Sequence, residues 1–448
     1  MNNMKRDFLL ILTLFATLSC TKVTPEKRIE TIYNYFDNEN TTALSTLETV
    51  SNNYPARMSG SQNNSDAIDY FTLILGNDIK VDNIWYQDVT VPHWLPGENS
   101  VSCKLSDGTT HGITAVPVGL SVGTDGNDLT ANIVEVTSRE AFDKANVKGK
   151  IVLFNEPMTA ENGYGKARWQ RTQGAALAGA KGAVAVLVRS MTTLTNDDPH
   201  TGSTRYDSTG VQIPAMAIST QAADKLSEEL KKDGRLKVTI NSTAKRLEDT
   251  IGRNLVAEIV GKKTPEHIIL LSAHLDSWFN SQGAQDNAAS CVTAVEVLRA
   301  FKKLKIKPNN TIRILLYQDE ECFLSGMKEY AKIAKEKNEE YLFDLEMDSG
   351  AGGPKSFRLA EKDIFFPKIK EITDQYLTPY GIEEITQVEE RKGWPLSDSM
   401  KIPYYGYVSN TDHYFDIHHS SSDNFDKIDP AAFKKGIATV TAFVYLMD

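Results

Sequence analysis

The sequence predicts an α/β protein with a mostly parallel central sheet, flanked by helices, and with a second domain inserted near the front of the chain. Two short apolar runs, residues 267–273 and 311–317, are separated by a stretch in which apolar residues recur at helical spacing. A strand, a crossover helix and a second strand form the unit that builds parallel sheets. An insertion is indicated between residues 101 and 245, where Gly, Thr and short apolar segments become more frequent.

Length and composition narrow the class of protein. The chain has 448 residues, which is enough for two hydrophobic cores. Its 41% hydrophobic and 24% charged residues are ordinary for a folded soluble body. The formal net charge of -10 argues against a nucleic acid partner, because phosphate binding needs a basic surface.

The first 20 residues predict a lipoprotein signal peptide. Lys5 and Arg6 precede an apolar run at residues 8–18, which is too short to span a membrane. Residues 17–20, Thr-Leu-Ser-Cys, resemble a bacterial lipoprotein box with an atypical first position. This resemblance implies that Cys20 is lipidated after cleavage. No other long apolar run is present, so a lipid anchor is the only membrane attachment expected.

Two further helices are predicted at the ends of the mature chain. Thr24 and Pro25 open an amphipathic segment whose apolar face is formed by Ile29, Ile32, Tyr33 and Phe36. Near the C-terminus, Asp429 is placed as an N-cap and Pro430 as the first helical residue, and an apolar segment follows. We expect this last helix to close the main domain.

Polar side chains gather at or near the ends of the predicted strands. Zinc accepts neutral imidazole nitrogen and carboxylate oxygen, and a catalytic zinc keeps one position open. Two divalent ions about 3.5–4 Å apart can act on one substrate. Two His and three carboxylates, one of them between the ions, fit that chemistry, and open parallel sheets place such sites at the carboxyl ends of their strands. The candidates are His274, Asp276, Asp286, Glu320, Glu321, Asp348 and His419.

Two motifs connect these residues to a known family. Residues 274–278, His-Leu-Asp-Ser-Trp, and residues 282–286, Gln-Gly-Ala-Gln-Asp, resemble signatures of the two-zinc aminopeptidase superfamily, in the branch that contains carboxypeptidase Q, or plasma glutamate carboxypeptidase. The resemblance implies two zinc ions per chain, with Glu320 as general base and Asp276 orienting His274. It implies as metal ligands His274, Asp286 (bridging), Glu321, Asp348 and His419.

The last ligand has three candidates close together, His413, His418 and His419. The superfamily's terminal motif is a His followed four positions later by Asp, and His419 with Asp423 fits it. Three positions depart from the family pattern without removing a ligand. These are Asn287 after the bridging Asp286, the pair Cys322-Phe323 after the two Glu residues, and Asn424. The pair at 322–323 puts the geometry of that loop in doubt.

The same resemblance divides the chain. Residues 22–100 form the N-terminal part of the catalytic domain, residues 101–245 the insertion, and residues 246–448 the rest of the catalytic domain. Residues 147–153 and 174–188 look like parts of a protease-associated domain. Residues 199–206 resemble a loop of the carboxypeptidase Q branch, which makes His200 a candidate for contact with substrate.

These patterns predict an exported zinc exopeptidase that hydrolyses short peptides or dipeptides. A carboxypeptidase, a zinc cyclase similar to glutaminyl cyclase and a non-catalytic binding protein are the alternatives, and the cyclase would hold one zinc. The family resemblance also implies a homodimer.

Cys103, Cys291 and Cys322 match no zinc-binding spacing. They are too scattered for a disulfide framework, although a single bridge between two of them is compatible with the sequence.

Overall fold

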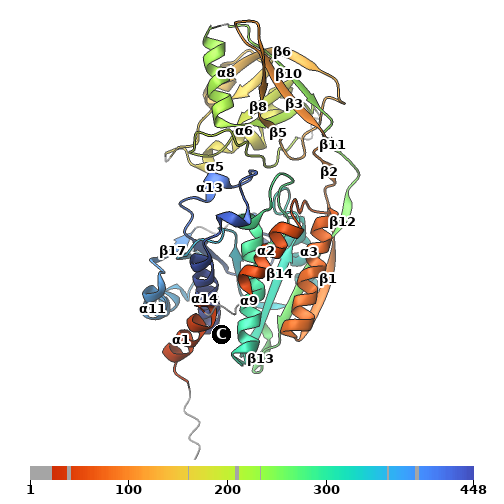
Figure 1. Ribbon diagram of the computed structural model, residues 1–448. Helices are drawn as coiled ribbons and strands as arrows, with labels where there is room; N and C mark the ends of the chain where they lie inside the picture. The colour runs from red at the N-terminus through yellow and green to blue at the C-terminus, as the bar shows by residue number, and fades with distance from the viewer. Residues whose placement is uncertain are drawn as a thin grey trace, which may run out of the picture.

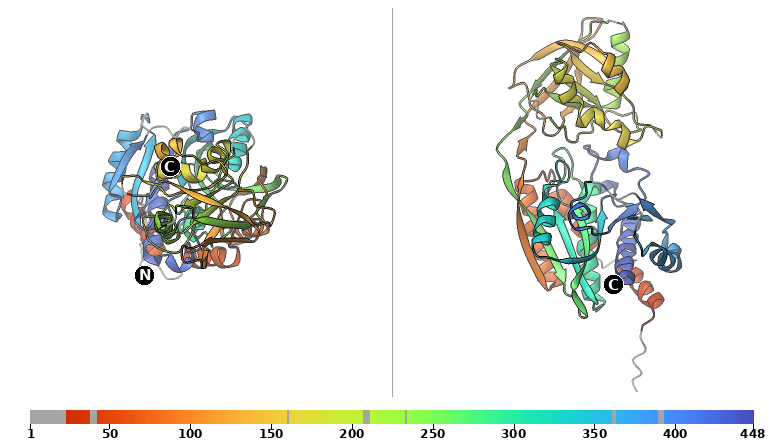
Figure 2. Two further views of the ribbon diagram at one scale, coloured as in Figure 1. Left: turned by 90° about the horizontal axis from the view of Figure 1, so that it is seen from above. Right: turned by 180° about the vertical axis from the view of Figure 1, so that it is seen from behind.

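The computed structural model describes residues 23–37, 42–159, 161–206, 211–232, 234–360, 363–388 and 393–448. The predicted signal peptide and Cys20 therefore lie outside the described residues. Two bodies are stacked end to end (Figures 1 and 2): a main domain, residues 23–91 and 250–448, and an insertion, residues 99–242. Among the described residues, no helix is both long and apolar enough to cross a membrane.

The main domain is built on an eight-stranded sheet of order β1-β12-β14-β13-β15-β18-β16-β17. Its centre is parallel, because β13 pairs in parallel with β14 and β15, and β15 with β18. The predicted α/β class and the predicted strands are confirmed. The strands are β1 Asn83–Val91, β12 Thr250–Ile259, β13 Thr264–His274, β14 Asn310–Tyr317, β15 Glu340–Met347, β16 Pro354–Ala360, β17 Glu384–Val388 and β18 Tyr404–Ser409.

Helices cover both faces of this sheet. Side chains alternate along each strand, so Leu255 and Ala257 of β12 face one helical layer while Val256 faces the other. The predicted crossover and C-terminal helices are confirmed, and Asp429 caps the latter by accepting the N–H groups of Ala431 and Ala432 at 2.9 and 3.1 Å. One layer contains α1 Pro25–Asp37, α2 Ala43–Asn53, α3 Gln62–Leu73, η1 Ile74–Ile79, α9 Ala289–Lys303, α11 Phe366–Tyr376 and α14 Pro430–Met447. The other contains α10 Ser325–Glu336 and α12 Pro395–Met400.

The insertion has a separate sheet of order β4-β3-β10-β6-β7-β8-β9-β5 and its own core. Residues 174–188, which resemble part of a protease-associated domain, contain α7 Gly174–Ala180 and most of β8 Ala185–Arg189. The strands are β3 Asn99–Lys104, β4 Thr110–Ile113, β5 Ala115–Pro117, β6 Leu129–Val136, β7 Ile151–Phe154, β8 Ala185–Arg189, β9 Ala215–Ile218 and β10 Lys237–Ser242. The helices are α4 Arg139–Lys144, α5 Tyr164–Ala167, α6 Trp169–Thr172, α7 Gly174–Ala180 and α8 Thr220–Lys232.

A double connection joins the two bodies. The chain leaves β1 through β2 Trp94–Leu95 and returns through β11 Lys245–Arg246, which pairs with β2, into β12. β1 then pairs antiparallel with β12 over its full length, from Asn83 opposite Glu258 to Val91 opposite Thr250. The main domain is thus one sheet made from both sides of the insertion. Short elements near the domain junction and the C-terminus are η2 Ala284–Ala288, η3 Thr378–Tyr380, α13 Tyr414–Ile417 and η4 Phe425–Lys427.

Candidate active site

The carboxyl ends of the parallel strands face the insertion (Figure 1), and the predicted ligands lie there. His274 is the last residue of β13, Glu320 and Glu321 follow β14, and Asp348 follows β15. β18 leads into α13, which delivers His419 from the same edge. Strand order therefore gathers residues that are up to 145 positions apart in sequence, as the rule for open parallel sheets predicts.

Asp286 lies between the two predicted histidine ligands. One carboxylate oxygen, Oδ1, is 3.2 Å from Nε2 of His274, and the other, Oδ2, is 3.2 Å from Nε2 of His419. Each imidazole also faces a second carboxylate: Asp348 Oδ1 is 3.4 Å from His274 Nε2, and Glu321 Oε2 is 3.0 Å from His419 Nε2. The arrangement forms two halves that share one carboxylate.

The chemistry of these atoms fits bound zinc. Ligand atoms of His274, Asp286 and Glu321 all lie within 4.8 Å of one another, and so do those of His274, Glu320 and Asp348. Oε1 of Glu321 is buried without a hydrogen-bond partner among the described residues, and Nε2 of His274 makes no hydrogen bond although two carboxylates flank it. Buried polar atoms left without partners point to a missing ligand. These distances alone do not show whether Glu320 is a metal ligand or the general base.

The acidic neighbours control protonation of the two imidazoles. Burial alone would lower the pKa of His274, but the nearby carboxylates of Asp276, Asp286 and Asp348 raise it well above its ordinary value. Burial also opposes protonation of His419, and the charge of Glu321 with the hydrogen bonds of Asp286 and Glu321 raises its pKa well above the ordinary value. Without a metal, both imidazoles hold protons that a metal ion must displace.

Asp276 supports two parts of the site at once. Its backbone carbonyl is 3.0 Å from Nδ1 of His274, whereas its carboxylate Oδ1 is 3.7 Å from that nitrogen. The carboxylate accepts the backbone N–H groups of Glu320 at 3.2 Å and Glu321 at 3.3 Å. The main chain of Asp276 therefore orients the imidazole, and its side chain holds the turn that carries the two glutamates. These two hydrogen bonds define the geometry of the loop that contains Cys322 and Phe323, which the sequence had left in doubt.

The geometry favours His419 among the three candidate histidines. His418 approaches Asp286 only to 3.6 Å, and its ring stacks on that of His419 with centroids 3.5 Å apart. Burial and the neighbouring His419 hold the pKa of His418 well below its usual range, so this ring is neutral. The His413 side chain is 92% exposed and pairs with Asp416. His419 alone of the three faces both Asp286 and Glu321.

Arg57 is a structural part of the site, although it was not among the predicted site residues. Its guanidinium is fully buried and donates to the carbonyls of Leu275 at 3.0 Å, Gln282 at 2.7 Å and Gly283 at 2.9 Å. A fourth bond reaches Tyr54 at 3.2 Å. One side chain from the N-terminal segment thus holds together the two ends of the loop between β13 and η2.

Asp423 holds the bridging residue from the other side. Its carboxylate accepts the backbone N–H groups of Gln285 at 2.7 Å and Asp286 at 3.1 Å. Burial raises the pKa of Asp423 to about 7. The spacing from His419 to Asp423 therefore has a structural reason, because it brings a predicted ligand and the residue that supports another predicted ligand into one loop.

A cleft of about 870 Å³ lies between the main domain and the insertion, within the size range of small-ligand sites. The main domain lines it with Asp286, Glu320, Glu321, Asp348, Tyr414 and His419, and the insertion with Tyr164, Arg168, Trp169, Arg171, Ser203 and Arg205. His200 is only 2% exposed and is not among the residues that line the cleft. Its contact with substrate stays a prediction.

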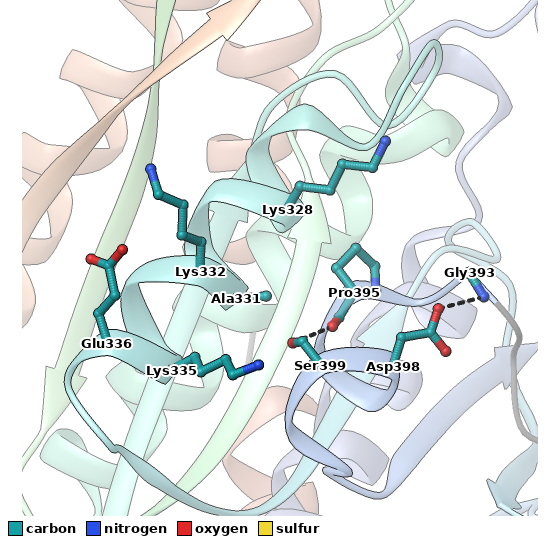
Figure 3. A pocket seen from close by; sticks show the side chains of 9 residues that line it. All are labelled: Lys328, Ala331, Lys332, Lys335, Glu336, Gly393, Pro395, Asp398 and Ser399. Carbon is teal, nitrogen blue, oxygen red and sulfur yellow. Dashed lines mark hydrogen bonds between the residues drawn. The ribbon is translucent and has the colours of Figure 1, made fainter.

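A second hollow lies on the outer surface between α10 and α12 (Figure 3). Its volume is about 680 Å³, and its lining includes Lys328, Lys332, Lys335 and Asp398. It shares Lys328 with the cleft but contains none of the predicted ligands. The cleft is therefore the candidate active site.

Cys103, Cys291 and Cys322 are buried as free thiols, so no bridge joins them.

Comparisons with known proteins decide the family. Residues 254–444 match peptidase family M28, and residues 115–226 match the PA domain. The chain is 31% identical over 405 residues to carboxypeptidase Q of Xenopus laevis, covering 90% of this chain and 84% of that protein. The chain belongs to peptidase family M28. The bovine carboxypeptidase Q is 29% identical over 393 residues, covering 87% of this M28 chain and 82% of the relative.

Solved structures agree with the fold of an M28 peptidase. A peptidase M28 precursor from Shewanella amazonensis superposes with a TM-score of 0.87 at 27% identity, covering 94% of this chain and 96% of that one. A zinc aminopeptidase from Bacillus subtilis superposes with a TM-score of 0.64 at 19% identity, covering 90% and 94%. The insertion is the PA domain expected from the sequence, and the chain is a zinc metallopeptidase.

The role of Arg57 predicts a large loss of stability on its removal. Arg57→Met would leave several buried carbonyls without donors, at roughly 1–3 kcal/mol each. We expect the free energy of unfolding to fall by roughly 3 kcal/mol or more, measured by denaturant titration. Arg253→Met is the control, because Arg253 pairs at the surface with Asp69 at 3.0 Å and should cost under about 1 kcal/mol. Equal losses in the two variants would contradict the role of Arg57.

The raised pKa values of His274 and His419 predict pH-dependent zinc binding. Zinc needs neutral imidazole, so binding releases protons, and affinity should weaken about tenfold per released proton for each pH unit below the folded pKa values. The stability of the metal-free chain depends on pH with the opposite sign. The raised pKa values of His274 and His419 stabilise the fold at low pH, and this contribution is lost as the pH rises through them. The increase in melting temperature at fixed free zinc should therefore grow with pH. An increase that does not change with pH would show that the imidazoles are not displaced.

Proposed function

We propose that this M28 peptidase is an exported exopeptidase that uses two zinc ions to hydrolyse short peptides or dipeptides. One observation carries the proposal: the two oxygens of Asp286 face two different imidazoles, His274 and His419. One ion would be held by His274, Asp286 and Asp348, and the other by His419, Asp286 and Glu321. Three protein ligands for each ion leave positions for water and substrate.

Glu320 is the proposed general base. When bound, a zinc pair activates water and polarises the scissile carbonyl. Glu320 lines the cleft, and its backbone N–H is held by Asp276. In that position its carboxylate can take a proton from the attacking water and return it to the leaving amine. Asp276 thus fixes the base through one oxygen and the ligand Glu321 through the other.

Glu320→Gln tests this assignment. Gln has nearly the same size but cannot accept the proton, so we expect kcat to fall by about 10²–10⁴-fold. Zinc content and melting temperature should stay at the wild-type values. Glu321→Gln is the matched comparison, and it should lose zinc as well as turnover because it removes a ligand charge. Full turnover in Glu320→Gln would exclude Glu320 as the base.

The charge of the cleft suggests which peptides enter it. Three of the five proposed metal ligands are carboxylates, whereas Arg168, Arg205 and Lys328 line other parts of the same cleft. Arg205 donates to the carbonyl of Cys322 at 2.5 Å, and its guanidinium lies 5.6 Å from the ring centroid of Phe323. These contacts fix it beside the turn that carries Glu320. A guanidinium has five N–H donors, so we propose that Arg205 also binds the free carboxylate of a short substrate.

Arg205→Gln separates recognition of that carboxylate from other effects. A charge-assisted hydrogen bond contributes roughly 1.5–3 kcal/mol, so KM for a free-acid dipeptide should rise about 10–100-fold. KM for the same dipeptide with a C-terminal amide should hardly change. Lys332→Gln is the control, because Lys332 lines the outer hollow and not the cleft. An equal rise for acid and amide would contradict carboxylate binding by Arg205.

The function itself is tested on the chain without residues 1–20, by counting bound zinc and comparing unblocked dipeptides, longer peptides and their N-acetylated forms. About two zinc ions per chain and cleavage of free-amine substrates alone indicate an aminopeptidase or dipeptidase, and the length series separates these. Cleavage of blocked peptides from the far end indicates a carboxypeptidase. About one zinc with cyclisation of N-terminal Gln favours the cyclase. Absence of turnover at full zinc loading favours a binding protein.

We further propose that Cys20 carries a lipid anchor that holds the enzyme at a bacterial cell envelope membrane. Two acyl chains give stable anchoring, whereas one does not. The wild-type chain should fractionate with membranes, and Cys20→Ala should release it. Recovery of wild type in the soluble fraction would exclude the anchor.

A homodimer is proposed from the family resemblance, and sedimentation velocity of the chain without residues 1–20 tests it.

A further inference from the structure

The PA domain contacts a metal ligand directly. The backbone N–H of Thr201 donates to the carbonyl of His419 at 2.9 Å, and the carbonyl of Thr201 lies 3.2 Å from Nδ1 of the same residue. Nε2 of His419 faces Asp286 and Glu321, so Nδ1 is the nitrogen left for an outer hydrogen bond. Histidines that bind metal usually donate this second N–H to a carbonyl or carboxylate, which fixes the tautomer and the ring orientation.

Arg171 holds the Thr201 carbonyl in this position. The side chain is 4% exposed, and its Nη1 donates to the Thr201 carbonyl at 2.6 Å while lying 3.3 Å from Nδ1 of His419. Its Nη2 donates to the hydroxyl of Tyr164 at 2.5 Å. A Cβ at Gly202 would overlap the guanidinium, and Gly202 has φ +135°, so glycine is required for this close approach. The carbonyl is thus clamped between a cation and the ligand ring.

The backbone of His419 also depends on the insertion. Its φ of +62° lies in the left-handed region, which a residue with a side chain rarely adopts and which persists only where the surroundings enforce it. The bond from Thr201 N–H is made to the carbonyl of this residue, and Asn280 Nδ2 approaches the same oxygen at 3.4 Å. The PA domain therefore stabilises the conformation that aims His419 at Asp286.

Two aromatic contacts extend the coupling. Tyr164 of α5 stacks on Phe415 of α13, with centroids 5.1 Å apart, and meets the His418 ring edge-on at 5.1 Å. The two helices lie side by side at the domain junction (Figure 1). On the other side of the site, a Cβ at Gly119 would overlap the buried indole of Trp278, which follows β13. The insertion is therefore packed against both ligand-bearing loops.

We propose that the PA domain is part of the metal centre, and that Arg171 is a positioning residue which holds the Thr201 carbonyl against Nδ1 of His419. Arg171 thereby fixes the His419 ring for the zinc ion on that side of Asp286. The inference rests on the proposed two-zinc function. Arg168 provides a matched comparison, because it lines the same cleft one turn earlier but is exposed.

The test measures zinc affinity in the full chain by competition with a chromogenic chelator, with no peptide present. In Arg171→Met we expect one of the two zinc ions to bind about 10–100-fold more weakly, with the other unchanged. In Arg168→Met both affinities should match wild type. The visible spectrum of the cobalt-substituted chain should change for one site only. A wild-type chain that holds fewer than two ions would refute the proposed function, whereas normal wild-type binding with no change in Arg171→Met would refute only this inference.

Two further outcomes would overturn the inference. An increase in KM without any loss of zinc affinity would mean that Arg171 contacts substrate. Equal weakening of both ions together with a lower melting temperature would mean a general structural role. If Arg171→Met does not fold, Arg171→Lys decides, because Lys keeps the charge and stem but lacks the planar fork that reaches both Thr201 and Tyr164. Selective weakening of one zinc ion in Arg171→Lys supports the role, and wild-type affinity in that variant excludes it.

Discussion

The buried guanidinium of Arg57 is the interaction on which the site depends. The connection between His274 and Asp286, residues 275–283, is irregular, so its buried carbonyls have no strand or helix to satisfy them. Arg57 satisfies three of these carbonyls from one planar group. Its positive charge also lies near the carboxylates of Asp276, Asp286 and Asp423. One side chain thus supplies both the hydrogen bonds and part of the charge balance of an acidic site.

The hydrogen bonds of Arg57 also help to explain how the chain tolerates a large insertion. Arg57 precedes the PA domain in the sequence, whereas Leu275 and Gln282, whose carbonyls it binds, follow that domain. The nine-residue pairing of β1 with β12 brings the two parts back into one sheet. A slip of one residue in that pairing would turn every side chain of β1 to the opposite face. The register of an edge strand therefore helps to fix the distance between the N-terminal segment and the proposed metal ligands.

Periodic elements and strand-end residues were predictable from the sequence, because they depend on local spacing. The strand ending at His274 and the crossover helix are of this kind, whereas His419 was chosen because its spacing to Asp423 resembles the superfamily's terminal motif. Arg171 and Arg205 were not predictable. The first meets His419 across 248 positions and the second meets Cys322 across 117, and neither contact leaves a periodic signal. Their positions depend on how two separate sheets dock, which no local pattern specifies.

Docking of this kind limits how the two bodies can move. Separating them would remove Thr201 from His419 and expose Trp278, which is 1% accessible beneath Gly119. Both changes would weaken the metal site and uncover apolar surface, at roughly 25 cal/mol for each Å². Exchange of peptides by wide opening of the junction is therefore unfavourable. Entry along the cleft past the exposed Arg168 and Arg205 leaves these contacts intact, and it leads the substrate past positive charge before it reaches the acidic ligands.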